Sequence, residues 1–457
     1  MTDPQRAHQA ARDLLGAGRV REGELAAAYA LNGLIPGLIL YPESCEELSA
    51  LLAEAYAAHL AVIPWGGGTK QHLGYLPRRC DWVVDLSRFS GISEHQEADF
   101  VVTVRAGTTL RQINEFLKER QQHLTLDPLE GDSATVGGIS AANSSGPLRI
   151  GFGTPRDLIL GMEVVMADGT AIRFGAKVVK SVAGYDLNKL YIGSLGTLGF
   201  ITELTFKTYS LKVQEESLLA GFQEAGAVQS AATRILAQRS LPTTLEWLTG
   251  QGLSTEKHLA ETAGSEHILL VSFTDNQIGA AKQLAEVESL CRASGAGAVV
   301  RLGPERARAM RESLSQAGPF HASAKGLGFA CRLGVPLTRV GETVERARTL
   351  GRAEGFGVVC QAHTGNGIVR ARFGWDEDEE DSRLTEHARR AVEGLQQAAR
   401  RVGGYAVIET RSLALRDSLD LWDEATISAT GLRLMQRAKE ALDPKGILNP
   451  GRFFGRI

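Results

Sequence analysis

The segment PWGGGTK, residues 64–70, carries residue types that bind anions. It follows an apolar stretch, AVIPW, and holds three consecutive glycines at 66–68. Because glycine accepts positive φ and has no Cβ, successive N–H groups of such a loop can converge on an anion. Thr69 adds a hydroxyl donor and Lys70 a positive charge. The loop matches neither the P-loop sequence GxxxxGK(S/T) nor GxGxxG, so an anion cradle and a plain tight turn both stay open.

Two further glycine-bearing segments follow. Residues 127–146, DPLEGDSATVGGISAANSSG, place small residues and short polar donors along one stretch. We expect an irregular segment that lies against an extended ligand, since long irregular loops in compact domains are usually functional; a surface loop with Ser and Asn turns is the alternative. In the third segment, residues 177–204, Gly193, Gly196 and Gly199 recur every third residue before an apolar strand.

The composition is that of an ordinary globular protein. The chain has 457 residues and 49.1 kDa, which favours two or three domains, and 43% of its residues are hydrophobic and 23% charged. The net charge of −3 and the pI near 6.4 exclude a generally basic nucleic-acid binder, and the basic residues form no stripe interleaved with aromatic residues. We therefore expect no nucleic-acid partner.

The cysteines bear on both redox chemistry and compartment. Five are widely spaced and no CxxC motif occurs, so the chain alone offers neither a zinc ribbon nor a ferredoxin-type iron–sulfur site. Scattered reduced thiols are typical of the cytosol. The N-terminus lacks the apolar segment of a secretory signal, and Gly and Pro break the longest apolar stretches, so we expect no membrane span. The expected location is cytoplasmic, with any contact to the inner membrane made through partners.

The pattern of apolar residues predicts an α+β protein. Its first part opens with a βαβ-like unit and continues as meandering strands. The helix at 44–60 begins with Ser44 as N-cap and Glu47 as its capping-box partner, and the ADG turn at 167–169 predicts a hairpin over 160–175. The remaining expected elements of this part are a helix at 5–31, strands at 37–40, 61–65, 81–86, 100–107 and 198–209, and a helix at 109–121.

From about residue 211 strands alternate with longer helices. Two successive β-α-β sets predict ferredoxin-like halves that share one antiparallel sheet. A last helix at 420–441 leads to the tail LDPKGILNPGRFF. The acidic run DEDEED at 376–381 lies between a strand and a helix, where it forms either a solvated loop or a docking patch for a basic partner.

Four motifs make the chain recognisable. PWGGGTK, the DP…ATVGG…NSSG segment, GYDL…GSLGTLGFITEL and the tail LDPKGILNPG, in this order and spacing, resemble the FAD-linked oxidases, flavoproteins of the vanillyl-alcohol-oxidase type. The resemblance covers nearly the whole chain after residue 35, and FGAKVVKSVAGYDLNKLYIGSLGTLG is most similar to the FAD-binding subunits of glycolate oxidases. It implies an N-terminal helical segment at 1–34, a PCMH-type FAD-binding domain of two subdomains at 35–210, a ferredoxin-like α+β cap with an antiparallel sheet at 211–418, and a C-terminal segment at 419–457 that returns to the FAD domain.

The resemblance also implies which residues hold FAD. The glycine loop would bind the pyrophosphate, and the second segment would lie beside the pyrophosphate, ribityl chain and flavin. Some relatives attach the flavin to a histidine near the loop; Thr69 stands at that place and His72 matches no known attachment pattern, so we expect non-covalent FAD. The residues so implied are Pro64, Trp65, Gly66, Gly67, Gly68, Thr69, Lys70, Pro128, Leu129, Ala134, Thr135, Gly137, Gly138, Asn143, Ile201 and Asn449.

The chain departs from the metal-dependent D-2-hydroxyacid dehydrogenases of this superfamily. Their GHxGDGNxH motif corresponds to AHTGNGIVR, in which His363 keeps the first histidine and Arg370 replaces the second. In their later Glu-His pair, Glu409 is kept and Thr410 replaces the histidine. Because a zinc site needs three or four ligands, we expect no metal. His363, Glu409 and Arg370 are the candidate catalytic residues; alternatively, His363 only flanks an Asn-Gly hairpin turn, and Glu409 only pairs with Arg370 or Arg411.

A second departure concerns the substrate carboxylate. The same relatives carry an arginine and a threonine where this chain has Val179 and Ala183. A small hydroxy-acid carboxylate favours a bidentate guanidinium. The absence of this arginine therefore weakens the expected binding of the substrate carboxylate, unless Arg370, Arg372 or Lys180 takes its place.

Three functions follow from the resemblance. The first is an FAD-binding subunit of a glycolate oxidase complex, which takes a hydride from C2 of glycolate or D-lactate to flavin N5 and passes electrons to a larger flavin subunit and an iron–sulfur subunit. The second is a stand-alone FAD-dependent dehydrogenase for a D-2-hydroxy acid such as D-lactate. The third is a flavin-holding assembly subunit without turnover of its own. The missing metal ligands and arginine favour the first or the third.

Overall fold

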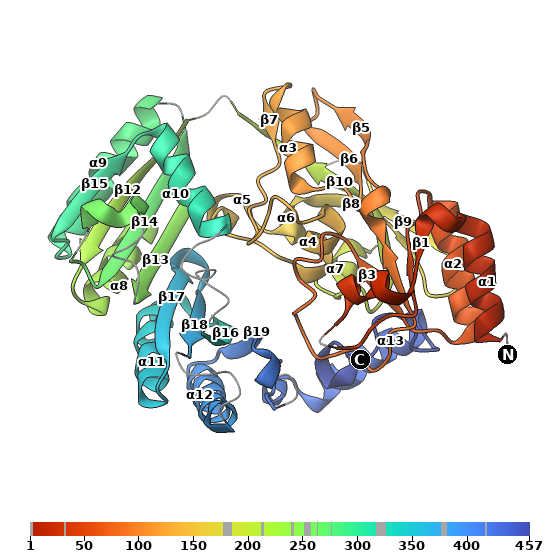
Figure 1. Cartoon of the computed structure of the whole chain (residues 1–457). Coiled ribbons are helices and arrows are strands. Elements are labelled where there is room, and N and C mark those ends of the chain that lie inside the picture. Colours follow the sequence, from red (N-terminus) through yellow and green to blue (C-terminus); the bar gives the residue numbers. More distant parts are fainter. Residues whose placement is uncertain are drawn as a thin grey trace. The chain divides into compact units, whose positions relative to one another are not determined.

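The chain divides into two compact units (Figure 1). Unit 1 comprises Met1–Ser145, Gly153–Leu211 and Ile427–Ile457, and unit 2 comprises Gly146–Phe152 and Lys212–Thr426. This computed structural model describes residues 3–457 apart from 32, 177–184, 212–213, 239–241, 251–256, 263, 276, 317–325, 376–381 and 416–417. Val179, Lys180, Ala183 and the acidic run 376–381 therefore lie outside the described residues.

Unit 1 begins with a small, mostly parallel sheet. Strands β2 (Leu38–Leu40), β4 (Trp82–Asp85) and β3 (Val62–Trp65) pair in parallel, and β1 (Val20–Arg21) adds an antiparallel edge. All residues of β2 and β4 are buried, which fits strands covered on both faces. Helices α1 (Pro4–Leu15) and α2 (Cys45–Ala58) pack against each other, and α1 also contacts β2.

Helix α2 starts where the sequence predicts, with one difference at its cap. The Ser44 hydroxyl accepts a hydrogen bond from the Glu47 N–H at 3.2 Å, which satisfies one donor that a helix start leaves free. The Glu47 carboxylate was predicted to complete a capping box. It accepts from the Arg19 guanidinium at 2.6 Å and from the Glu43 N–H at 2.8 Å, and these contacts, with a weaker one from the Ser44 N–H of the predicted box, lower the pKa of Glu47.

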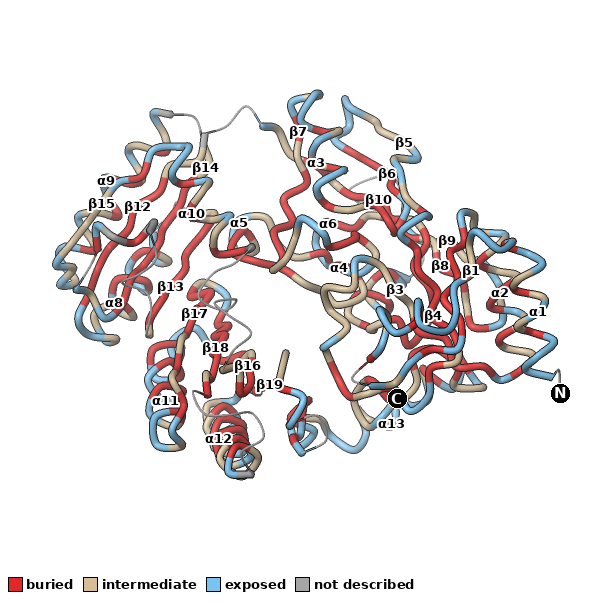
Figure 2. Tube along the Cα trace, in the orientation of Figure 1, coloured by how far each residue is buried: buried red, intermediate tan, exposed pale blue. Residues whose placement is uncertain are grey.

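The second sheet of unit 1 is antiparallel. Its order is β5 (Ile92–Gln96), β6 (Val101–Arg105), β10 (Phe200–Lys207), β8 (Ile159–Val165) and β9 (Ala171–Gly175). The β8–β9 hairpin turns through Gly169, whose φ of 89° suits glycine, so the hairpin prediction is confirmed. One apolar cluster joins both sheets and contains, for example, Trp82 and Phe200. Figure 2 shows that inner strands of both sheets, such as β4, β6 and β10, are largely buried.

Two expected helices of unit 1 have different ends, and one element was missed. Gly16, with φ 74°, ends α1 at Leu15, so no single helix covers 5–31. The last helix, predicted at 420–441, begins only at Ala429, because the Ser428 hydroxyl caps it by accepting from the Gly431 N–H. A short helix, α4 (Val136–Ala142), forms within 127–146, which was expected to be irregular.

The other regular elements of unit 1 are mostly short, apart from the helices α3 (Leu110–Lys118) and α13 (Ala429–Leu442). The short ones are η1 (Ala17–Arg19), η2 (Gly23–Tyr29), η3 (Leu86–Arg88), β7 (Gln122–His123), α6 (Pro155–Leu158), α7 (Asn188–Tyr191), β11 (Tyr209–Ser210) and η10 (Phe454–Arg456).

Unit 2 is built on one eight-stranded antiparallel sheet with the order β15-β12-β14-β13-β17-β18-β16-β19. Numbered by chain order, the four strands of each half lie as 4-1-3-2, and a helix follows the first and third strand. This is the ferredoxin-like arrangement, so the predicted pair of halves is confirmed. The halves meet where β13 pairs with β17. The strands are β12 (Gln214–Phe222), β13 (Thr244–Gly250), β14 (His267–Asp275), β15 (Ala298–Leu302), β16 (Leu327–Gly334), β17 (Gly357–His363), β18 (Ile368–Gly374) and β19 (Tyr405–Arg411).

Helices cover one face of this sheet closely. Gly351 lets α11 approach the strands, because a Cβ there would lie 2.2 Å from Val358 Cγ2 and 2.9 Å from the Phe373 ring. The four helices of the ferredoxin-like halves are α8 (Ala225–Leu236), α9 (Gln277–Ala293), α11 (Val340–Ala353) and α12 (Ser382–Arg401). The short turns η5 (Lys257–Thr262), η6 (Leu337–Arg339), η7 (Thr364–Asn366), η8 (Leu413–Leu415) and η9 (Glu424–Thr426) complete the unit.

The opposite face is covered only in part by a helix. An element that the sequence reasoning missed, α10 (Pro304–Gln316), packs Met310 and Leu314 against Leu219 and Leu270 in a buried apolar cluster. That cluster occupies the half of the sheet around β12 and β14. The short helix α5 (Arg149–Phe152) contacts β13, the strand that pairs with β17 of the second half of the sheet.

Candidate functional sites

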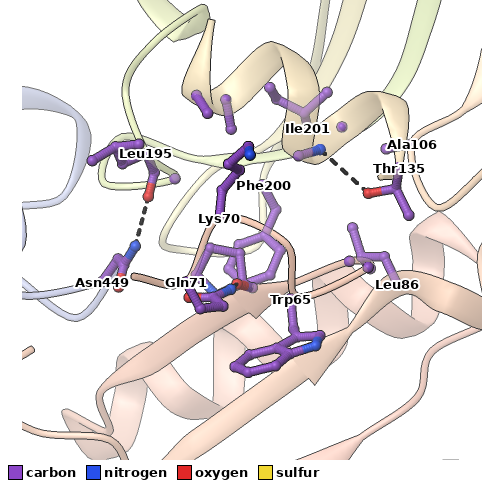
Figure 3. A pocket seen from close by; sticks show the side chains of 18 of the residues that line it. Trp65, Lys70, Gln71, Leu86, Ala106, Thr135, Leu195, Phe200, Ile201 and Asn449 are labelled. Atoms are coloured by element: carbon purple, nitrogen blue, oxygen red, sulfur yellow. Dashed lines mark hydrogen bonds between the residues drawn. The ribbon is translucent and has the colours of Figure 1, made fainter. Parts of the chain in front are cut away.

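A cavity of unit 1 lies where the glycine-bearing segments meet (Figure 3). It holds about 790 Å³ of empty space, its open mouth included, which is within the size range of cofactor pockets. Its lining combines backbone-rich loops with apolar side chains. The lining residues are Pro64, Trp65, Gly66, Gly67, Gly68, Thr69, Lys70, Gln71, Leu86, Ala106, Thr135, Gly137, Gly138, Ala141, Ala142, Leu195, Gly196, Gly199, Phe200, Ile201, Asn449 and Arg452.

Two of these segments touch, and the absence of side chains makes the contact possible. A Cβ at Gly66 would lie 2.2 Å from Thr135 Oγ1, and one at Gly67 would lie 2.0 Å from the Ser133 carbonyl oxygen. Neither distance leaves room for a side chain. The PWGGGTK loop is therefore pressed directly against residues 133–135, and its glycines are required by this packing as well as by any ligand.

The loop also offers backbone donors. Within the part of the chain that the structure describes, the N–H groups of Gly67, Gly68 and Thr69 make no hydrogen bond. Lys70 adds a positive charge at the cavity, although its Nζ lies 4.0 Å from Glu130 Oε2. Consecutive unpaired N–H groups beside a lysine favour a phosphate-bearing ligand.

The C-terminal tail completes the cavity and is fixed to unit 1. The Asn449 side-chain amide donates to the Leu195 carbonyl at 2.6 Å (Figure 3). The Asn449 backbone N–H donates to the Val62 carbonyl at 2.9 Å. The buried Lys439 ammonium donates to the Thr197 carbonyl at 2.7 Å. The tail thus holds the glycine-containing turn 193–199 beside strand β3.

Most residues that the resemblance implies for FAD line this cavity, but four do not. Pro128, Leu129, Ala134 and Asn143 are outside its lining, since Ala134 packs in the core and Asn143 ends α4 with a φ of 46°. Sequence reasoning missed Arg452, which lines the cavity and donates to the Gln71 carbonyl at 2.6 Å. The role of each residue toward FAD stays a prediction.

The candidate catalytic residues lie in unit 2, where strand register brings them together. Glu246 is opposite His363, and Arg370 lies between Gln361 on one neighbouring strand and Arg332 on the other. Residues paired across adjacent strands place their side chains on the same face of a sheet. These five residues therefore form one polar row across β13, β17, β18 and β16, which we call the polar row.

His363 and Glu246 form a buried pair, each with a side chain only 1% exposed. His363 Nδ1 lies 2.6 Å from Glu246 Oε1, and Gln361 Nε2 donates to Glu246 Oε2 at 2.7 Å. With the Nδ1 hydrogen donated to the carboxylate, Nε2 carries the lone pair, and it has no hydrogen-bond partner among the described residues. Burial is the main cause that lowers the pKa of His363, and Arg370 acts in the same direction, so the imidazole is neutral near pH 7.

Glu409 joins the polar row from β19 and bridges two guanidinium groups. Its Oε1 lies 3.4 Å from Arg332 Nε and its Oε2 lies 3.3 Å from Arg370 Nε. The expected pairing of Glu409 with Arg370 is therefore confirmed, and Arg332 is a second partner that the sequence did not reveal. The sequence did show Arg332 as a charged residue within an apolar strand, which is a possible sign of function. Its neighbours Arg370 and Glu409 could be recognised only from the strand register in the structure.

A third arginine comes from a distant part of the sequence. Arg149 belongs to α5. The next residue, Ile150, packs closely against Gly365, since a Cβ added to Gly365 would lie 2.0 Å from Ile150 Cδ1. Burial lowers the pKa of the Arg149 guanidinium, and repulsion from Arg332 and Arg370 lowers it further. Its Nε is buried with no hydrogen-bond partner among the described residues.

The donor set of this row does not fit a metal ion. Across the described residues, no group of three or more His, Cys, Asp or Glu is arranged to hold one. His363 Nδ1 is occupied by Glu246, and the guanidinium groups beside Glu409 would repel a dication. The expectation of a metal-free site stays a prediction.

Two family models match the chain. One, described as an FAD binding domain, covers residues 36–175, and the other, described as FAD linked oxidases, C-terminal domain, covers residues 212–453, more than half of the chain. The chain belongs to the FAD-linked oxidases. It is an FAD-dependent oxidoreductase of the glycolate oxidase and D-lactate dehydrogenase type.

Its relatives among FAD-linked oxidases are distant but aligned over most of their length. Glycolate oxidase subunit GlcD of Bacillus subtilis is 26% identical over 426 residues, which are 92% of this chain and 90% of that protein. The D-lactate dehydrogenase of Archaeoglobus fulgidus is 26% identical over 433 residues, 92% of each protein. The mitochondrial D-lactate dehydrogenase (cytochrome) of Arabidopsis thaliana is 27% identical over 92% of this chain and 73% of its own length.

Solved structures show the same fold. p-Cresol methylhydroxylase with bound substrate and 4-ethylphenol oxidase from Gulosibacter chungangensis each match with a TM-score of 0.78 at 16% identity, over 98% of this chain and 96% of their own. The predicted PCMH-type fold is therefore confirmed. Among the described residues, no helix has the length and apolar character needed to cross a membrane.

FAD is the cofactor of this family, and the cavity of unit 1 fits it. The glycine loop forms a cradle in which a Cβ would collide with the neighbouring segment, and its N–H groups are available to a pyrophosphate. Apolar side chains of Leu86, Phe200 and Ile201 line the same cavity and suit a planar ring system. No histidine is among the lining residues.

Proposed function

We propose that this chain oxidises a small 2-hydroxy acid, glycolate or D-lactate, with non-covalent FAD, as the FAD-binding subunit of a glycolate-oxidase-type complex. The relatives named as a glycolate oxidase subunit and as D-lactate dehydrogenases support this substrate class. The observation that carries the proposal is the buried His363–Glu246 pair, which presents a neutral imidazole with its Nε2 unpaired. Thr69 at the usual place of a flavin-linking histidine supports non-covalent binding.

His363 acts as the general base in this proposal. Oxidation of a 2-hydroxy acid to a 2-oxo acid removes two electrons and two protons, and bound FAD supplies the two-electron acceptor. His363 Nε2 takes the hydroxyl proton, while the hydrogen bond from Nδ1 to Glu246 fixes the tautomer and stabilises the imidazolium that forms. A buried acceptor without a partner costs about 1–3 kcal/mol, which a substrate hydroxyl would offset.

Electron accounting supports a partner. This chain has five cysteines, which are widely spaced in the sequence and form no CxxC motif. Four of the five thiols are buried. Electrons therefore have no iron–sulfur route within the chain and must leave to another molecule. We propose that they pass to a larger flavin subunit and an iron–sulfur subunit, in the cytoplasm.

Two alternatives stay distinct from this proposal. The D-lactate dehydrogenases align with 92% of this chain, which favours a stand-alone dehydrogenase as the second candidate. Val179, which stands where relatives carry an arginine, favours a flavin-holding subunit without turnover as the third.

Anaerobic flavin bleaching separates the three. The FAD-loaded chain is mixed with glycolate or D-lactate, alone and after co-expression with the larger flavin subunit and the iron–sulfur subunit, and dye-linked turnover is measured in parallel. We expect little turnover by the chain alone and turnover by the co-expressed complex. Rapid steady-state oxidation by the chain alone would establish the stand-alone dehydrogenase. A flavin that neither acid bleaches in either preparation would leave only the assembly role.

A further inference from the structure

Lys439 and Asp443 form a buried ion pair in unit 1, with 2.6 Å between Lys439 Nζ and Asp443 Oδ2. Neither residue lines the cavity. We propose that they are positioning residues, and that the pair holds two walls of the cavity in the shape that binds FAD. The inference goes beyond the proposed function, because it concerns how the cofactor is held and does not depend on which substrate is oxidised.

The ammonium of Lys439 joins two segments that contribute to the lining of the cavity. Its Nζ donates to the Thr197 carbonyl oxygen at 2.7 Å and to the Leu448 carbonyl oxygen at 2.9 Å. Thr197 belongs to the turn 193–199, and Leu448 belongs to the C-terminal tail. With Asp443 as the third acceptor, each of the three ammonium hydrogens has one acceptor. One side chain therefore connects the turn to the tail.

Asp443 fixes the tail from the other side. It is 1% exposed, and its Oδ1 accepts from the Ile447 N–H at 3.1 Å while its Oδ2 accepts from the Leu448 N–H at 2.8 Å. The Ile447 carbonyl in turn accepts from the Val62 N–H of strand β3 at 2.8 Å. Because β3 runs into the glycines at 66–68, the ion pair is connected to a third segment that lines the cavity.

Two lining residues have backbone conformations that need such support. Leu195 has a φ of 53° and Asn449 a φ of 44°, in the left-handed region that asparagine tolerates better than leucine. The Asn449 side-chain amide donates to the Leu195 carbonyl at 2.6 Å (Figure 3). Conformations of this kind persist only where the surrounding structure imposes them. Lys439 supplies part of that structure, because it binds the backbone close to both residues.

Loss of the ion pair should therefore weaken FAD binding in a chain that is still folded. The turn 193–199 touches β3, since a Cβ at Gly196 would lie 2.4 Å from Pro64 Cγ, and both residues line the cavity. Without Lys439, the turn and the tail would take this arrangement only part of the time. The apparent affinity for a ligand falls by the fraction of molecules that are competent to bind it.

Titration of the deflavinated full chain with FAD, followed by flavin fluorescence, tests the role of the pair. Lys439→Met removes the ammonium and keeps an unbranched side chain. We expect the Kd for FAD to rise about 10- to 100-fold, which corresponds to a binding-competent population of about 1–10%. No hydroxy acid is present, so a failure of this inference is distinguishable from a failure of the proposed function.

A double variant separates positioning from the burial of a lone charge. Lys439→Met leaves the Asp443 carboxylate buried without its cation, which is strongly destabilising. Lys439→Met/Asp443→Asn removes both charges, and the asparagine oxygen can still accept from the N–H groups of the tail. We expect this variant to fold, as judged by circular dichroism and by thermal melting without FAD. Its Kd for FAD should still rise about 10-fold or more, because the turn remains unattached.

Lys445→Met is the matched control, since it is the same substitution in the same tail. Lys445 Nζ donates to the Tyr56 carbonyl at 2.8 Å and lies 4.1 Å from the centre of the Tyr56 ring on α2. Neither of these residues lines the cavity. We expect Lys445→Met to lower the melting temperature and to leave the Kd for FAD unchanged.

The outcomes decide between positioning and stability alone. Weaker FAD binding in both Lys439 variants, but not in Lys445→Met, supports the inference whether or not any hydroxy acid is oxidised. The inference is overturned if both Lys439 variants bind FAD with the wild-type Kd, whatever their melting temperatures. It is also overturned if Lys445→Met raises the Kd as much, or if the double variant does not fold, since the pair would then serve the fold rather than the cavity.

Discussion

The two candidate sites of this chain are built from opposite materials. The cavity of unit 1 is formed mainly by backbone: its glycines are pressed against a neighbouring segment, and the N–H groups of residues 67–69 have no partner among the described residues. The polar row of unit 2 is formed by charged side chains whose neighbours come from other strands. A backbone site tolerates few changes at its glycines, whereas a side-chain site is tuned residue by residue. If the cavity holds the cofactor and the polar row acts on the substrate, as we propose, the two functions should be separable by mutation.

The largest expected effect is at the backbone site. In Gly67→Val, the new Cβ would lie 2.0 Å from the Ser133 carbonyl oxygen, so the loop and residues 133–135 can no longer touch. We expect a protein that purifies without yellow colour, with FAD absorbance lost. In the wild type, acid precipitation should release the FAD into solution, since no histidine lines the cavity.

Gly226→Ala is the control for that variant. Gly226 lies in α8, and nothing lies within 4 Å of the position a Cβ would take. Alanine in a helix is favoured over glycine by up to about 1 kcal/mol, so this variant should keep its FAD and melt slightly higher. If Gly67→Val stayed fully yellow, the loop would not hold the cofactor; flavin that stayed in the wild-type pellet would show covalent attachment.

The next effect is at the side-chain site. Replacing His363 by Gln removes the proposed base, and loss of a general base typically lowers the rate about 10²- to 10⁴-fold. FAD content should be unchanged, because His363 belongs to unit 2 and the cavity is lined by unit 1. The measurement is flavin reduction by glycolate or D-lactate in the co-expressed complex.

Glu246→Gln sharpens the same test. The glutamine can still accept from Nδ1 but no longer stabilises the imidazolium, so Glu246 is a positioning residue and its loss should shift the pH profile of flavin reduction as well as slow it. Equal rates in wild type and His363→Gln would mean that His363 only packs at the end of the β17–β18 hairpin, the alternative that the sequence left open.

The same contrast explains what could be predicted from sequence. The loop at 64–70 is contiguous, so its residue types suggested an anion cradle with a tight turn as the alternative, and the resemblance to the FAD-linked oxidases then indicated FAD. The ferredoxin-like halves followed from the order of strands and helices. Glu246, Arg149 and Arg332 were missed because each becomes meaningful only through a partner more than a hundred residues away or on another strand. Helix α4 was missed because its capping residue, Thr135, lies in a stretch whose glycines resemble a loop.

A smaller effect concerns the stability of unit 2 in acid. His267 is 2% exposed and its Nδ1 accepts from the Trp247 indole N–H at 3.3 Å. Burial, with repulsion from Arg348, lowers the pKa of His267 from 6.5 to about 4. Between these values the unfolded chain binds a proton that the folded chain does not, so stability is complete above pH 6.5 and is lost as the pH falls toward 4.

We expect this group to account for about 3 kcal/mol of the free energy of unfolding across that window. Urea unfolding at several pH values measures it, and His267→Gln should show a shallower dependence because it cannot titrate. Parallel slopes in both proteins would mean that the acid lability arises elsewhere in the chain.

The smallest expected effect is that of removing metal ions, because the polar row lacks the arrangement of donors that a metal site needs. A divalent ion needs several anionic or neutral donors that converge, whereas the donors around Glu409 face two guanidinium groups and His363 has its Nδ1 engaged. Treatment with a chelator should therefore leave the rate of flavin reduction, the FAD content and the melting temperature unchanged, and elemental analysis should find no stoichiometric metal. One zinc or manganese per chain, removed by the chelator together with activity, would overturn the expectation of a metal-free site and would show that the polar row holds a cation in spite of its arginines.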